Sequence, residues 1–94
     1  MKATNLVSDL MVVAAFRYCL GRTSYIVSDG ADMVRAVWPT LEPNTRNLIR
    51  RELTEAEISD DNARDGGDTD YRPLGMDCDR DIWLELKAWI EKQK

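Results

Sequence analysis

The chain has 94 residues, of which 44% are hydrophobic and 32% charged, and its formal net charge is −4. This length and balance suit one folded domain spanning residues 1–94 and exclude a largely disordered chain. The charge is distributed unevenly, because residues 52–81 hold eleven acidic residues and three arginines while the remainder is net positive. Charge of this kind bears on binding partners more than on fold.

No apolar run approaches the roughly 18 residues that a membrane-spanning helix needs. The apolar stretch Leu10–Phe16 follows an acidic residue and lacks a small-residue cleavage site, so it does not match a secretory signal. We therefore expect a cytoplasmic protein. Its two cysteines, Cys19 and Cys78, are then expected to be reduced, while a disulfide between them remains open.

The first predicted helix begins at Asn5 or Ser8, either of which offers a side-chain acceptor to the free amides of an opening turn. It ends at Gly21, because glycine readily adopts the left-handed conformation that closes a helix. The segment Val12–Phe16 is apolar on nearly all sides, which predicts burial on more than one face. Cys19 lies in the same apolar run and is expected in the core.

The second predicted helix begins at Thr23 or Ser24 and continues to Trp38. Pro39 ends it, since a proline disfavours the helical conformation of the residue before it. Gly30 lies inside this helix at a cost of up to about 1 kcal/mol relative to alanine. It indicates either close approach of a neighbouring helix or a restart of the helix nearby, and the sequence does not decide between them.

The third predicted helix covers roughly Asn44–Asp60, or a little beyond, with a narrow apolar stripe. Its basic residues come early and its acidic residues late, which opposes the helix dipole and predicts fraying at its end. A Gly/Asp-rich acidic loop, about residues 61–76, follows. A loop of this length in a small domain is expected to be mobile or functional.

The last predicted helix begins at Asp77 or Asp79 and carries a wide apolar face. Acidic residues at its start and lysines at its end match the helix dipole. The predicted fold is therefore all-α: a small bundle of about four helices with the long acidic loop before the last one.

The sequence contains no recognisable catalytic or metal-binding motif. With no histidine, the usual acid–base group at neutral pH and a Cys/His zinc site are both excluded. A calcium loop starting at Asp60 fails, because its fifth position is Arg64 and its twelfth is Tyr71. We expect a non-enzymatic protein without a catalytic site, a metal site or a cofactor.

Two charged clusters are candidate binding sites. Arg46, Arg50 and Arg51 lie within six positions of one helix and suit either nucleic-acid contact in a helix-turn-helix-like domain or a solvated helix face. The acidic segment suits either a solvated loop or an anionic surface that docks on the basic groove of a nucleic-acid-binding protein. That surface would consist of Asp60, Asp61, Asp65, Asp68 and Asp70.

Trp38, Trp83 and Trp89 are expected to be buried or partly buried. Trp83 and Trp89 are six residues apart on one predicted helix, so they cannot share a single line of its surface. One of them is therefore a candidate contact for a partner or for a second copy of the chain, which leaves a homodimer open.

The segment Phe-Arg-Tyr-Cys-Leu-Gly-Arg-Thr-Ser-Tyr-Ile-Val (residues 16–27), followed by Trp38, resembles a family of small proteins encoded by tailed bacteriophages and prophages. The segments Leu48–Glu52 and Leu74–Asp79 fit the same family. The resemblance covers about two-thirds of the chain. It implies no catalytic residues.

This resemblance implies a role inside a bacterial host cell. Small acidic phage proteins often bind and block host proteins, and anti-CRISPR proteins do so by occupying nucleic-acid-binding surfaces. The leading hypothesis is thus a phage inhibitor of a host defence complex, such as a CRISPR effector. The alternative is a phage DNA-binding or regulatory protein that uses the arginine cluster. A self-associating structural protein is a third hypothesis.

Overall fold

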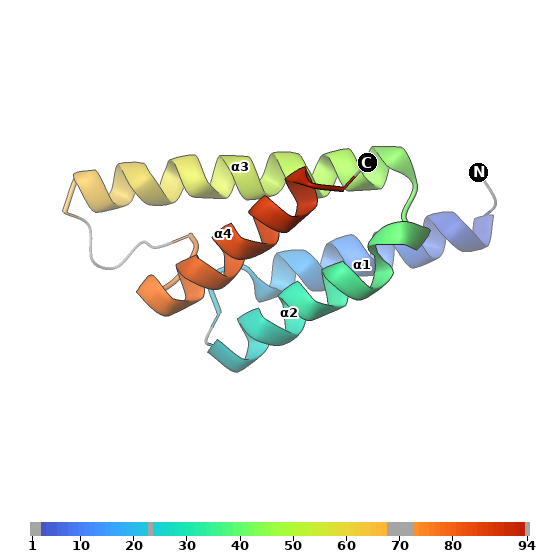
Figure 1. The fold of residues 1–94 in the computed structure, drawn as a ribbon, viewed down its shortest axis with the longest axis horizontal. Helices are drawn as coiled ribbons and strands as arrows, with labels where there is room; N and C mark the ends of the chain where they lie inside the picture. Colours follow the sequence, from blue (N-terminus) through green and yellow to red (C-terminus); the bar gives the residue numbers. More distant parts are fainter. Residues whose placement is uncertain (1–2, 23, 68–72, 94) are drawn as a thin grey trace.

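The computed structural model describes residues 3–22, 24–67 and 73–93, and four α-helices account for most of them (Figure 1). The elements are α1 (Ala3–Cys19), α2 (Ser24–Val37), a short 3-10 helix η1 (Trp38–Thr40), α3 (Pro43–Asp65) and α4 (Asp77–Glu91). No strand occurs in these ranges. The predicted all-α fold is confirmed.

The helices form an elongated bundle with extents of 46 × 23 × 19 Å. In Figure 1, α3 runs along the long axis at the top, α4 crosses in front of it at an angle, and α1 and α2 lie below. Helix α2 packs against α1 and α4, and α3 packs against the same two helices. Each helix therefore buries one face in a shared core.

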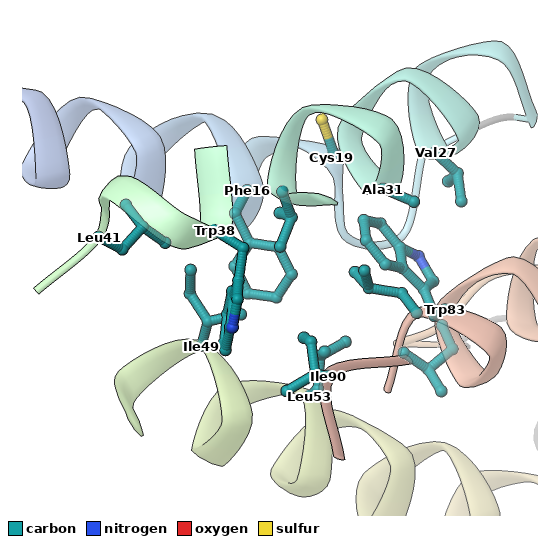
Figure 2. Packing of buried hydrophobic residues seen from close by; sticks show 13 residues of the cluster. Phe16, Cys19, Val27, Ala31, Trp38, Leu41, Ile49, Leu53, Trp83 and Ile90 are labelled. Carbon is teal, nitrogen blue, oxygen red and sulfur yellow. The ribbon is translucent and has the colours of Figure 1, made fainter. Parts of the chain in front are cut away.

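Aromatic side chains organise the core (Figure 2). Trp83 is fully buried and meets the ring of Phe16 edge to face, with centroids 5.6 Å apart. Trp38 is also buried and packs edge to face on Trp89 at 6.3 Å. Trp89 is only partly buried, so the two tryptophans of α4 do differ in exposure as their spacing predicts.

Gly30 and Gly21 shape the junction between α1 and α2. A Cβ atom added at Gly30 would lie 2.7 Å from the Sγ atom of Cys19, which is closer than van der Waals contact permits. Gly30 therefore marks a close approach between α1 and α2. Helix α2 continues through it without a restart. Gly21 has φ +76° and ends α1 in the left-handed conformation, as the sequence predicts.

Two predicted boundaries are wrong. α1 begins at Ala3, before both candidate capping residues. The acidic loop predicted from residue 61 begins later, because α3 extends to Asp65, residues 61–65 are helical and the connecting segment begins at Gly66. The adverse dipole is offset because Arg64 lies in the last turn and because Asp60, one turn earlier, binds two arginines.

Candidate functional site

Asp60 is the centre of a charged network where α3 ends and α4 begins. Its side chain is fully buried. Its carboxylate accepts hydrogen bonds from Arg64 Nε at 2.6 Å and from Arg80 Nη1, and the backbone N–H of Leu74 donates to it at 3.3 Å. One carboxylate thus connects α3, α4 and the segment between them.

The two arginines also bind acceptors farther out. Arg64 contacts Asp77 Oδ1 through Nη1 at 2.6 Å and donates from Nη2 to the carbonyl oxygen of Gly75 at 3.1 Å. Arg80 contacts Asp61 Oδ1 through Nη2 at 2.7 Å. We call Asp60, Asp61, Arg64, Asp77 and Arg80 the Asp60 network.

The charges of this network stabilise one another. Burial by itself raises the pKa of Asp60, but the hydrogen bonds from Arg64 and Arg80 outweigh it and hold that pKa below its ordinary value. The hydrogen bond to Asp60 raises the pKa of Arg64. All three groups are therefore charged at neutral pH.

The structure places the aspartates of the predicted acidic surface in different surroundings. Asp60 cannot contact a partner, because it is fully buried and engaged by two arginines. Asp61 is half-exposed and Asp65 is exposed, as a docking surface requires. Asp68 and Asp70 lie outside the described residues.

Two further aspartates join the exposed ones. Asp77 and Asp81 are exposed on the first turns of α4, one turn apart, as Asp61 and Asp65 are on the last turns of α3. The Asp60 network holds the two helix ends together. We call Asp61, Asp65, Asp77 and Asp81 the acidic end; their spacing of four residues was the signal in the sequence.

The acidic end has more exposed carboxylates than free cations. Arg64 and Arg80 lie among these residues; their side chains are about four-fifths buried, and each divides its guanidinium between Asp60 and one exposed aspartate, Asp77 or Asp61. Asp65 and Asp81 have no ion-pair partner among the described residues. The end therefore presents a negative surface on a structured support rather than on a loop.

The three arginines of the second predicted site lie on the first turns of α3, which we call the arginine end. Arg46 donates from Nε and Nη2 to the carbonyl oxygens of Trp38 and Pro39, both at 3.0 Å. The guanidinium of Arg50 lies 5.2 Å from the centroid of the Trp38 ring. Arg51 is exposed, with a distant contact to Glu55 at 3.9 Å.

A shallow groove of about 290 Å³ lies between α1 and α3. An ion pair between Arg17 and Glu52 lies across it, and Leu20, Ala56 and Pro73 supply apolar walls. These groups include no nucleophile activated by a base.

Metal-binding and thiol chemistry find no support in the described residues. No group of three or more His, Cys, Asp or Glu side chains in them is arranged to hold a metal ion. Cys19 and Cys78 do not form a disulfide in the described structure, and burial raises the pKa of the Cys19 thiol, which lowers its reactivity. None of the described helices is long and apolar enough to cross a membrane.

No family model matches the chain, and no curated protein and no solved structure shows significant similarity to it.

Proposed function

We propose that this chain is a non-enzymatic binding protein that docks its acidic end on a basic, nucleic-acid-binding surface of another protein. The resemblance to small phage proteins makes a host defence complex, in the manner of anti-CRISPR proteins, the proposed target. The observation that carries the proposal is the acidic end itself. Four exposed aspartates lie on two adjoining helix ends, and the two arginines among them also bind the buried Asp60, which leaves Asp65 and Asp81 without an ion pair in the described residues.

The structure of this end favours recognition over mere solubility. A carboxylate cluster on a mobile loop must be ordered on binding, which costs conformational entropy. Here α3 and α4 already hold the four aspartates, and the Asp60 network fixes the relation between the two helices. Negative groups fixed in this way complement a basic groove and accelerate encounter with it.

The alternative function, direct DNA binding through the arginine end, has less support. Arg46 is engaged with two backbone carbonyls, and Arg50 lies over the Trp38 ring. Only Arg51 of this cluster is exposed, with 67% of its side chain accessible and a 3.9 Å contact to Glu55. A single exposed arginine supplies little of the phosphate neutralisation on which non-specific DNA affinity depends.

An affinity capture from bacterial lysate tests the proposal, with nuclease-treated and untreated samples in parallel. We expect a protein partner that survives nuclease treatment and that releases its own nucleic acid when this chain binds. Binding of the purified partner should weaken as salt concentration rises. Recovery of nucleic acid alone would contradict the proposal and support the arginine end.

A charge-reversal pair locates the surface. Asp65→Lys with Asp81→Lys removes two aspartates that hold no ion pair in the described structure, so the fold should remain intact. We expect partner binding to weaken by about a hundredfold. The control, Asp29→Lys with Glu91→Lys, changes the net charge equally at exposed positions on α2 and at the far end of α4. Equal weakening by both variants would exclude the acidic end as the docking surface.

A further inference from the structure

The groove between α1 and α3 has one wall that is rich in hydrogen-bond acceptors. That wall is α3, which contributes Glu52, Glu55 and Ser59 to the described lining. Because these residues are spaced by three and four positions, their side chains lie on one face of the helix. Opposite them, α1 contributes Arg17. The described lining therefore holds two carboxylates and one cation.

Arg17 binds only one oxygen of the Glu52 carboxylate. Arg17 Nε donates to Glu52 Oε1 at 2.7 Å, and Arg17 Nη2 contacts the same oxygen at 2.5 Å. The other oxygen, Oε2, is buried and has no hydrogen-bond partner among the described residues. A buried acceptor without a donor costs free energy, and native structures rarely leave one unsatisfied. The unpaired oxygen indicates a place for a further donor beside the groove.

Two more acceptors follow along α3. Glu55 has 67% of its side chain exposed, and its contact to Arg51 is long, at 3.9 Å. Ser59 is partly buried and offers a hydroxyl oxygen. Together with Glu52 Oε2 they suit a primary ammonium group, which donates through three N–H bonds and carries a positive charge. An anion in the same place would meet two glutamates, so charge complementarity favours a cation.

The remaining walls of the groove are apolar. Leu20 and Ala56 pack against the hydrophobic core, and Pro73 lies on the segment before α4. An alkyl stem lies along walls of this kind while its charged end stays with polar groups, as lysine side chains do elsewhere. The groove, at about 290 Å³, is at the lower limit of small-molecule pockets, which span roughly 300–1,000 Å³. Its size therefore suits one alkyl chain with a charged end.

We propose that this groove binds a primary ammonium group on an alkyl stem, with the ammonium at the three acceptors of α3 and the stem against the apolar walls. Arg17 keeps its contact to Glu52 Oε1. A lysine side chain of another protein and a free aliphatic diamine both carry this chemistry. The four aspartates of the acidic end are not among the described lining residues, so this inference does not depend on the proposed function.

An NMR titration of the isotope-labelled chain tests the site and distinguishes the two sources. The probes are Nα-acetyl-lysine-N-methylamide and cadaverine, and the control is the norleucine analogue, which has the stem without the charge. We expect both cations to give saturable shifts at the amides of Glu52, Glu55 and Ser59, with dissociation constants on the order of millimolar. Tighter binding of the lysine probe would indicate a protein lysine as occupant, and tighter binding of cadaverine a free diamine. Equal shifts with the norleucine analogue, or no saturable shifts with either cation, would overturn the proposal.

Two substitutions at the ion pair should change the affinity for the lysine probe in opposite directions. Glu52→Gln removes a negative charge from the site and should weaken binding by about tenfold, whereas Arg17→Met removes the neighbouring cation and should strengthen it by about threefold. Both variants break the same ion pair, so an effect through the fold alone would have the same sign in both. Glu85→Gln, at an exposed position of α4, is the matched control and should bind normally. Weaker binding in both variants, or unchanged binding in both, contradicts the proposed site.

Discussion

At the acidic end a carboxylate is the buried group and two arginines surround it, whereas at the arginine end the guanidinium groups lie over Trp38 and against backbone carbonyls. Asp60 engages both Arg64 and Arg80, which also pair with Asp77 and Asp61, so Asp65 and Asp81 are left on the surface without an ion pair among the described residues. Arg46 and Arg50 at the other end satisfy groups of their own chain. Both ends use arginines internally, and both surfaces consequently become less basic than the sequence implies.

The difference shows how charge in a sequence is redistributed by folding. An arginine that binds a buried carboxylate cancels one charge and leaves the exposed acids in excess. An arginine that binds carbonyl oxygens keeps its charge but loses the freedom to reach a phosphate. For this reason the acidic end is the stronger candidate for recognition, and the internal roles of the two ends can be tested separately.

The largest expected effect is at Asp60. Asp60→Asn leaves two partly buried guanidinium groups without their shared carboxylate, and we expect a loss of about 3 kcal/mol in the free energy of unfolding. This is a large fraction of the stability of a domain this small. Urea denaturation followed by circular dichroism measures it. Asp61→Asn, which removes only the half-exposed outer contact to Arg80, is the control and should cost about 0.5 kcal/mol.

The pH dependence of stability should distinguish the contribution of Asp60 from that of the exposed aspartates. The pKa of Asp60 is lower in the folded chain than its ordinary value of 3.8, so its stabilising contribution is complete above that value and disappears as pH falls through the lowered pKa. We expect the wild-type free energy of unfolding to fall steeply below about pH 4. In Asp60→Asn the fall should be shallower. Parallel pH curves for the two proteins would show that Asp60 does not titrate differently on folding.

Much of the fold follows from local sequence signals. Gly21 predicts the end of α1, Pro39 the end of α2, and the apolar face around Trp83 predicts α4. These signals act within one helix or at its ends. The extension of α3 to Asp65 was harder to predict in this way, because the last turns of α3 include Asp60, whose partner Arg80 is twenty residues away in the chain.

The candidate site was harder to predict for the same reason. Composition alone marks the segment around Asp60 as acidic, but it gives no indication that this aspartate is the buried one. Only the folded arrangement distinguishes it from Asp61, its neighbour. Burial within the apolar stretch of α1 is also uneven, because the helix directs Val13 and Phe16 inward and leaves Leu10 and Met11 mostly exposed.

At the arginine end, an intermediate effect is expected at Asp9. Its carboxylate accepts from the backbone N–H of Glu42 and from Thr45 at the start of α3, and so caps that helix from α1. Asp9→Ala should lower the free energy of unfolding by about 1.5 kcal/mol. Thermal denaturation measures the change. Ser8→Ala, at the exposed neighbouring position, is the control and should leave the midpoint unchanged.

The smallest expected effect compares two arginines of one helix. Arg46→Met removes hydrogen bonds to the carbonyl oxygens of Trp38 and Pro39 and should lower the free energy of unfolding by about 1 kcal/mol. Arg51→Met should change the free energy of unfolding by no more than about 0.5 kcal/mol. The emission of the nearby Trp38 should change in the first variant only, because its surroundings become wetter. Similar costs for both variants would mean that Arg46 is as free as Arg51. In that case the arginine end would again be a candidate nucleic-acid contact. Binding to duplex DNA at low salt should then be lost in both variants.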